Sequence, residues 1–291
     1  MIAINWGSSN FRAYKLDVAA NVEAERSSGR GAVQVPPGSF FDALMAEVGD
    51  WIRNGETKVL MSGMVGARHG WKEAPYVSLP AAFDQVVDGV IRLELDLFDA
   101  RIVPGLIGAD ECGVPEVLRG EETEIFGCES ELASYTHLCL PGTHTKWIRM
   151  ESARITAFST SMTGDLYKAI REGTILSACT QPEPTDSDAF LLGVARSKQA
   201  GALAHHLFGV RTLVLTGGIQ ESSASSYLSG LLIGHEVDSM ARPGERIHLI
   251  GDPALCSLYA KALREFGVNS SLEPAGAALR GLVRIAERLA W

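Results

Sequence analysis

Two short glycine turns with hydroxyl side chains are the part of this chain best suited to chemistry on phosphates. Gly7-Ser8-Ser9 follows a short apolar segment, Ile2–Trp6, and precedes an alternating one, and Gly142-Thr143-His144-Thr145 has the same setting. Glycine lets the backbone approach a ligand closely, and successive amides with Ser or Thr hydroxyls form a concavity that suits phosphate. Either turn alone is typical of an ordinary hairpin. The pair, one near the start of each half, predicts two half-sites for one phosphate ligand.

A second stretch, residues 62–76, combines several glycines with aromatic and cationic side chains. This composition is typical of a binding loop, since functional residues concentrate on loops held by a scaffold. The alternative is a mobile connection. A third candidate is the adjacent acidic pair Glu121 and Glu122, which follows Gly120 and opens a predicted helix. Acids at a helix N-terminus are stabilised by the helix dipole, so a purely structural role would also explain them.

Composition limits the kinds of partner. The 291 residues are 46% hydrophobic and 21% charged, with a formal net charge of −9. This acidity argues against a nucleic-acid partner but leaves a local cationic pocket for a small anion possible. The five cysteines are scattered without zinc-ligand spacing, which favours reduced thiols in a cytosolic protein. No apolar run approaches the roughly 18 residues of a membrane helix. We expect a cytoplasmic protein without a membrane partner.

Hydrophobic periodicity predicts the same order of elements twice: strands joined by hairpins, then strands alternating with helices. Each order fits a mixed sheet covered by helices, so the fold class is α/β with two duplicated domains. The boundary is placed near residue 130, giving domains 1–130 and 131–291, with residues 274–291 as an amphipathic terminal helix. Other expectations are a loop at 105–115, a loop at 181–186, one helix at 186–207, and a buried strand, Leu213–Leu215, ending in Thr216-Gly217-Gly218.

The ordered motifs resemble those of the actin/hexokinase/Hsp70-like ATPase superfamily, and within it the 2-dehydro-3-deoxygalactonokinase family. The resemblance spans nearly the whole chain. The segments that carry it are residues 4–13, Met61–Gly66 with Gly70–Tyr76, Arg119–Thr123, Pro141–Trp147, Met162–Asp165 and Leu228–Val237. It implies two ribonuclease-H-like (actin-like ATPase) domains with an interdomain cleft. It also implies transfer of phosphate from MgATP to the terminal hydroxyl of 2-dehydro-3-deoxy-D-galactonate, in galactonate breakdown.

The resemblance assigns roles to individual residues. A carboxylate just after a glycine serves as base in related kinases, which points to Glu121, with Glu122 second; the helix dipole should keep it ionised. Lys146 follows the second turn and could neutralise charge on the transferring group; the alternative is an ordinary exposed strand lysine. The nucleotide would be held by Gly7, Ser8, Ser9, Gly142, Thr143, Thr145 and, at the adenosine, Gly217 and Gly218. The substrate carboxylate would meet Arg12, Arg68 or Lys72, because cations bind carboxylates strongly, while Trp71 and Tyr76 pack on its carbon chain.

One departure from the family pattern concerns the metal. Asn5 stands where the family usually carries Asp near Mg²⁺, and a neutral amide should hold a hard cation less firmly. The alternative is that the metal acid has moved, to Asp17 or Asp165. His144 could orient a phosphate or only complete its turn. Two rival functions stay open: a kinase of another sugar or sugar acid, and a non-catalytic ligand sensor. The resemblance makes a homodimer plausible.

Overall fold

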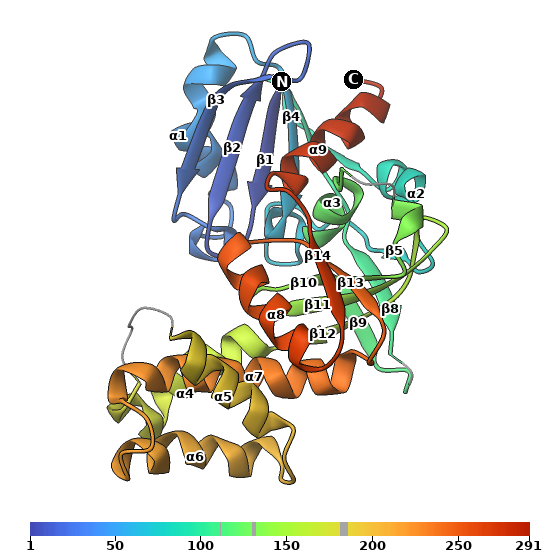
Figure 1. Cartoon of the computed structure of the whole chain (residues 1–291). Helices are drawn as coiled ribbons and strands as arrows, with labels where there is room; N and C mark the ends of the chain where they lie inside the picture. Colours follow the sequence, from blue (N-terminus) through green and yellow to red (C-terminus); the bar gives the residue numbers. More distant parts are fainter. Residues whose placement is uncertain (111, 130–131, 181–185) are drawn as a thin grey trace. The chain divides into compact units, whose positions relative to one another are not determined.

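The computed structural model describes residues 1–110, 112–129, 132–180 and 186–291 (Figure 1). They form two compact units. Unit 1 comprises residues 1–135, 149–158 and 274–291, and unit 2 comprises residues 136–148 and 159–273. Five of the six residues in the loop expected at 181–186 lie outside the described residues. In the part of the chain that is described, no helix is both long and apolar enough to cross a bilayer.

Unit 1 is built on a mixed six-stranded sheet with the order β3-β2-β1-β4-β7-β6. The central strand β1 is antiparallel to β2 and parallel to β4, and its apolar side chains are buried on both faces. Helix α1 (Phe40–Arg53) buries the apolar face that its periodicity predicts. The strands are β1 (Ile2–Trp6), β2 (Phe11–Leu16), β3 (Val22–Ser28), β4 (Lys58–Gly63), β6 (Ile91–Leu93) and β7 (Asp99–Ile102).

A smaller three-stranded sheet in unit 1 corrects the loop expected at 105–115. Leu106–Ala109 is strand β8, which pairs antiparallel with β9 (Pro115–Leu118) and parallel with β5 (Val77–Ser78). The glycine that suggested a loop, Gly105, instead allows close packing, because a Cβ there would lie 2.4 Å from the Leu118 carbonyl oxygen. Two short helices, α2 (Phe83–Asp88) and α3 (Glu121–Phe126), complete this region.

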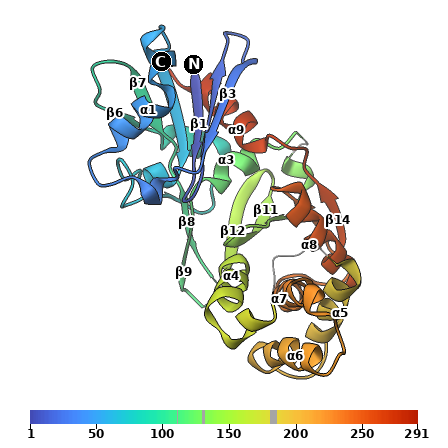
Figure 2. The same cartoon turned by 90° about the vertical axis from the view of Figure 1, so that its left-hand side faces the viewer.

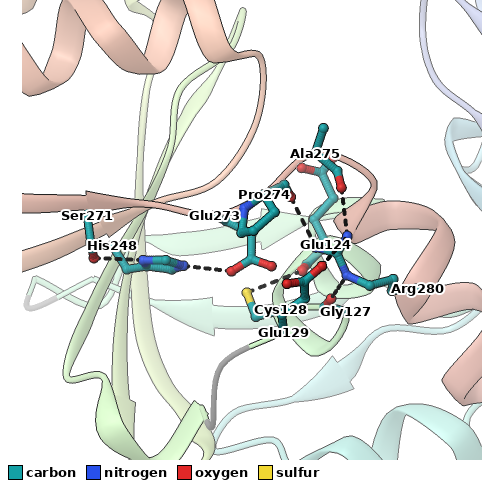
Figure 3. Close-up of polar contacts among 10 residues, drawn as sticks. All are labelled: Glu124, Gly127, Cys128, Glu129, His248, Ser271, Glu273, Pro274, Ala275 and Arg280. Atoms are coloured by element: carbon teal, nitrogen blue, oxygen red, sulfur yellow. Dashed lines mark hydrogen bonds and ion pairs between the residues drawn. The ribbon is translucent and has the colours of Figure 1, made fainter.

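The terminal helix α9 (Ala277–Arg288) belongs to unit 1, so the expectation that 131–291 is one domain needs correction. Its buried face contacts α3, β1 and β4. Gly281 allows the contact with α3, since a Cβ there would lie 1.8 Å from the Thr123 carbonyl oxygen. Arg280 fixes the approach by donating to the carbonyls of Gly127 at 2.8 Å and Ala275 at 2.6 Å (Figure 3). Residues 149–158 join unit 1 through a bridge between Ala81 and Ile155.

The second large sheet repeats the topology of the first. Its order, β12-β11-β10-β13-β14, matches β3-β2-β1-β4-β7, and β10, β13 and β14 run parallel. The predicted duplication is therefore confirmed. In β13, the buried side chain of His248 forms hydrogen bonds with Glu273 at 2.8 Å and with Ser271 at 2.9 Å (Figure 3). The strands are β10 (His137–Leu140), β11 (Thr145–Glu151), β12 (Arg154–Ser161), β13 (Arg246–Leu249) and β14 (Asn269–Leu272).

Unit 2 also contains several helices, and two of them differ from expectation. The single helix expected at 186–207 is two helices, α5 and α6, separated at Gly201, whose φ of +131° is outside the helical range. Figures 1 and 2 show α5 and α6 packed beside α7. The helices are α4 (Thr163–Gly173), α5 (Ser187–Ser197), α6 (Leu203–Leu215), α7 (Ala224–Met240) and α8 (Pro253–Glu265), with 3₁₀ turns at Ala32–Gln34, Met64–Gly66, Leu132–Ser134, Ile175–Ala178 and Glu221–Ser223.

The buried strand expected at Leu213–Leu215 is wrong, because these residues form the last turn of α6. Leu215 is 68% exposed. Gly217 has a φ of +75°, its amide donates to Val214 O, and the Gly218 amide donates to Leu213 O. This is the Schellman pattern, in which a left-handed glycine ends a helix. The glycine pair therefore terminates a helix.

Candidate active site

The first glycine turn joins β1 to β2 in unit 1. The Gly7 amide donates to Asn10 O at 2.9 Å and closes the turn. From outside, the amides of Ala32 and Val33 donate to the carbonyls of Gly7 and Ser8. Ser8 and its neighbour Ser9 are exposed. The turn is thus fixed through its carbonyls, while its hydroxyl side chains face solvent.

Two glycines with positive φ bring the acidic helix start to this turn. In the parallel pairing of β1 with β4, Trp6 lies opposite Gly63. A Cβ on Gly63 would lie 2.6 Å from Trp6 O and 3.4 Å from Asn5 Oδ1, and one on Gly120 would lie 3.3 Å from Gly63 Cα. Only glycine combines a φ near +100° with such close backbone approach. The end of β1, Asn5 and the start of α3 at Glu121 are therefore neighbours.

The two adjacent glutamates have different surroundings. Glu121 is half-buried, and its Oε2 accepts a hydrogen bond from the Arg119 amide at 2.9 Å. Glu122 is fully buried, its Oε2 accepts from the Gly120 amide at 2.7 Å, and its Oε1 has no hydrogen-bond partner in the described chain. Burial, reinforced by the charge of Glu121, raises the pKa of Glu122 to about 8. Glu122 is thus mainly neutral at pH 7, which leaves Glu121 as the candidate base.

Arg119 is a residue that the sequence reasoning passed over, although it opens the Arg-Gly-Glu-Glu motif. It is 9% exposed, and its Nη2 donates to Ala74 O at 2.7 Å. Its guanidinium lies 4.4 Å from the ring centre of Tyr76, and Nε and Nη1 lack partners among the described residues. The structure thus places Tyr76 against Arg119, next to the candidate base.

The other residues expected to bind substrate are dispersed. Trp71 packs against Phe40 with ring centres 6.4 Å apart, as part of the unit 1 core. Arg12 lies 3.8 Å from Glu25 on β3, whereas Lys72 donates to the carbonyl of Arg92 on β6. Strands β3 and β6 are the two opposite edges of the six-stranded sheet. The structure does not bring Arg12 and Lys72 together. Arg68, the remaining cationic candidate, is exposed.

The second glycine turn joins β10 to β11 in unit 2 and rests on the start of α4. A Cβ on Gly164 would lie 2.6 Å from Gly142 O, and the Asp165 amide donates to Thr143 O at 3.1 Å. His144 Nε2 lies 2.6 Å from Asp165 Oδ2, so this histidine is tied to α4. Lys146 is buried, and its Nζ donates to the carbonyl of His144 at 3.2 Å. This places the ammonium group directly behind the turn.

A buried chain of polar side chains supports the same turn. Thr145 Oγ1 lies 3.5 Å from the Gly142 amide and 2.8 Å from the Tyr259 hydroxyl. Tyr259 donates to Glu236 Oε2 at 2.7 Å, and the Trp147 indole donates to Glu236 Oε1 at 2.6 Å. Burial raises the pKa of Glu236, while its hydrogen bonds from neighbouring side chains act in the opposite direction. The turn is therefore connected to α7 and α8.

A pocket of about 210 Å³ opens beside Gly142 in unit 2. Its walls come mainly from α4, α7 and α8, with Phe190 from α5, and combine apolar side chains with hydroxyl groups. This mixture suits a flat apolar ring that carries polar edges, such as a nucleoside base. The residues that define its character are Tyr167, Ser225, Ser229, Ile233, Leu255 and Leu258.

The glycine turn next to this pocket is Gly251, after β13. Gly251 has a φ of +137°, and a Cβ there would lie 3.4 Å from Pro141 O. Asp252 then caps α8 by accepting from the Leu255 amide at 3.0 Å. Gly217 and Gly218, expected at the adenosine, are not among the residues that line the pocket. The sequence contained a signal for the turn at Gly251, namely a predicted buried strand followed by Gly-Asp-Pro.

The three residues considered as metal ligands, Asn5, Asp17 and Asp165, lie in different parts of the structure. Asp17 Oδ1 accepts from the amides of Ala19 and Asn21, both at 2.8 Å, and so caps the turn between β2 and β3. That turn is at the opposite end of β2 from Ser8. Asp165 lies beside the second glycine turn, and Asn5 lies at the end of β1 next to the first. The amide oxygen of Asn5 is a suitable but uncharged oxygen donor for a hard cation.

The repeated sheet, with a glycine turn after the first strand of each copy, defines the actin-like ATPase fold. A solved structure, the activator of the 2-hydroxyisocaproyl-CoA dehydratase from Clostridium difficile with bound ADPNP, shares this fold. Its TM-score is 0.50 at 12% identity, covering 99% of this chain and 94% of that one. At this identity the likeness concerns the fold alone.

The sequence model of the family described as 2-keto-3-deoxy-galactonokinase matches residues 5–285, and the chain belongs to this family. A probable 2-dehydro-3-deoxygalactonokinase of Rhizobium meliloti (strain 1021) is 36% identical, covering 99% of this chain and 97% of its own length. The 2-dehydro-3-deoxygalactonokinase of Escherichia coli (strain K12) is 35% identical, covering 92% and 90%. A crystal structure from Sinorhizobium meliloti, provisionally assigned the same activity, has a TM-score of 0.86 at 34% identity, covering 98% of each chain.

Proposed function

We propose that this protein phosphorylates the terminal, 6-hydroxyl group of 2-dehydro-3-deoxy-D-galactonate with ATP, as a step in galactonate breakdown. The observation that carries the proposal is membership of the family over residues 5–285. Each unit, taken by itself, holds groups that the reaction needs: both contain a glycine turn, unit 1 contains Glu121, and unit 2 contains the pocket of about 210 Å³.

In the proposed reaction Glu121 accepts the proton of the sugar-acid hydroxyl while the oxygen of that hydroxyl attacks the γ-phosphorus of ATP. The bond between the γ-phosphorus and the β,γ-bridging oxygen breaks, and ADP leaves. Such transfer depends on alignment and charge neutralisation more than on covalent help from the protein. The first turn, with Ser8 and Ser9, and the second turn, with Thr143, would hold phosphate oxygens. Lys146, behind the second turn, would contribute positive charge.

Mg²⁺ bound to the phosphates would neutralise part of their charge. Asn5 would hold it, directly or through water, with an uncharged oxygen. The pocket beside Gly142 would take the adenosine in place of the glycine pair at 217 and 218. Among the cations, Arg68 on the exposed loop and Arg12 are the proposed partners of the substrate carboxylate, since a guanidinium can bind it through two hydrogen bonds.

We also propose a cytoplasmic location. The five cysteines, all of which lie in the described part of the chain, form no disulfide bond, and four of them are buried, which agrees with a reducing compartment. The proposed partners are the sugar acid and ATP, and the formation of a homodimer stays a prediction.

A coupled ADP-release assay with a panel of 2-keto-3-deoxy sugar acids tests the proposed function. We expect turnover with 2-dehydro-3-deoxy-D-galactonate and the highest kcat/KM for it within the panel. A higher value for another sugar or sugar acid would identify a different kinase. Nucleotide binding without turnover of any acid would favour the sensor, the alternative that the neutral Asn5 suggests.

A further inference from the structure

The buried polar chain behind the second glycine turn has a defined direction. The Trp147 indole can only donate, so Glu236 Oε1 accepts its hydrogen bond at 2.6 Å. The Tyr259 hydroxyl donates to Glu236 Oε2 at 2.7 Å. A tyrosine hydroxyl has one hydrogen, so at its 2.8 Å contact with Thr145 it must accept. The hydrogen of Thr145 is therefore directed away from the turn.

The orientation of Thr145 has a consequence for the turn itself. With its hydrogen given to Tyr259, Thr145 Oγ1 offers only lone pairs to the Gly142 amide, 3.5 Å away. Thr145 and Tyr259 are 0% and 1% exposed, so water does not compete for these bonds. The hydroxyl of Thr145 thus acts on the peptide of Gly142. A direct hydrogen bond from Thr145 to a phosphate would require the hydrogen bonds from Thr145 to Tyr259 and from Tyr259 to Glu236 to reverse their direction.

The chain also connects two parts of the nucleotide site. Tyr259 lines the pocket beside Gly142, and its hydroxyl reaches the side chain that ends the turn. One residue of α8 therefore contributes to the wall of the pocket and to the support of the turn. Glu236, from α7, fixes the Tyr259 hydroxyl and is itself only 5% exposed.

We propose that Glu236 and Tyr259 are positioning residues for the phosphates of the nucleotide, because through Thr145 they hold the Gly142–Thr145 turn in its phosphate-binding shape. This inference rests on the proposed ATP site and adds two residues outside the glycine turns. They act through the turn and need not touch the nucleotide's phosphates. The contribution of Glu236 and Tyr259 to ligand affinity should grow with the number of phosphates on the ligand and be absent for adenosine.

The variant Tyr259→Phe keeps the ring and removes the hydroxyl. We expect its Kd for ATP and ADP, measured by calorimetry, to rise by roughly 5- to 50-fold, as for the loss of a buried hydrogen bond. The Kd for adenosine should stay within about twofold of wild type, because the pocket wall is retained. Equal weakening of adenosine and ATP, or unchanged ATP binding, would overturn the inference.

Two further comparisons separate positioning from general destabilisation. Thr145→Val should reproduce the selective loss of ATP affinity. Thr145→Ser keeps the hydroxyl and should therefore bind ATP as tightly as the wild type. These variants test the same chain if Tyr259→Phe does not fold. Tyr227→Phe is the matched control, because Tyr227 is also buried, at 4% exposure, but does not line the pocket. Wild-type protein that binds no ATP would instead refute the proposed function.

Discussion

The different surroundings of the two adjacent glutamates lead to a prediction about Glu122→Gln. Glu122 is fully buried and has a pKa of about 8, raised first by burial and then by the charge of Glu121. In the folded protein at pH 7 it carries a proton, and glutamine has nearly the same shape as this neutral form. The variant should therefore fold, and it should lose the dependence of stability on pH that Glu122 confers.

The sign and size of this pH dependence of stability follow from the pKa of Glu122 in the unfolded chain and in the folded protein. The ordinary value is 4.5 and the folded value about 8. Between them the folded protein keeps a proton that the unfolded chain has released, so stability falls as pH rises. The contribution is fully present below pH 4.5 and is lost as pH rises through 8. A full proton difference gives a slope of about 1.4 kcal/mol per pH unit, and the whole interval gives about 5 kcal/mol as an upper bound.

Urea unfolding at pH 5, 6, 7 and 8 measures this slope. Tryptophan fluorescence mainly follows unit 1, because Trp6, Trp51, Trp71 and Trp291 lie there and Trp147 alone lies in unit 2. We expect the wild-type free energy of unfolding to fall more steeply than that of Glu122→Gln, by up to about 1.4 kcal/mol per pH unit. The nearby Glu124, whose pKa burial raises to about 7, titrates in both proteins and cancels in the difference.

Two results would refute the reasoning. Parallel pH profiles would show that Glu122 is not protonated in the folded state. A Glu122→Gln variant destabilised by more than about 3 kcal/mol at pH 7 would indicate that a buried, paired carboxylate had been removed. The kinetic counterpart is that Glu122→Gln should keep kcat within a few fold of wild type, because the neutral acid does not serve as the base.

The remaining predictions concern the base, the substrate and the metal. Glu121→Gln should lower kcat by roughly 10²–10⁴-fold with little change in ATP affinity, and a variant keeping more than half of wild-type kcat would remove Glu121 from this role. Arg68→Met and Arg12→Met should raise the KM for the sugar acid far more than for ATP, and equal effects on both would show that the carboxylate binds elsewhere. Asn5→Asp should lower the Mg²⁺ concentration for half-maximal rate, because a charged oxygen holds a hard cation better. An unchanged or higher requirement would contradict a metal contact at position 5.

The duplicated sheets could be predicted because their signals are local. A glycine turn between a short apolar segment and an alternating one indicates a hairpin from neighbouring residues alone, and this pattern occurs twice. The segment Leu213–Leu215 had no such signal. Three apolar residues before Thr-Gly-Gly fit a buried strand ending in a turn and a helix ending in a left-handed glycine equally well. The structure shows the helix, in which Gly217 adopts the required positive φ.

The support of the second turn could not be predicted, because its bonds join distant parts of the chain. Thr145 and Tyr259 are 114 residues apart, and Trp147 and Glu236 are 89 apart. No spacing rule connects them, and each residue alone fits an ordinary core or surface position. Only the folded sheet, with α7 and α8 packed against it, reveals that they share one network. The same applies to Arg280, which bonds Gly127 from 153 residues away.

The chemistry of the acidic pair depended on burial, which the sequence did not show. At a helix start the dipole is expected to keep a carboxylate ionised. Helix α3 has six residues, so its dipole is small, and Glu122 is buried in the interior of unit 1. There the cost of removing a charge from water exceeds the gain from the dipole and from the Gly120 amide, and the pKa rises. Glu121, one residue earlier, is half-buried and accepts a hydrogen bond from the Arg119 amide. Adjacent residues of one type therefore receive different tasks, one structural and neutral, the other a candidate base.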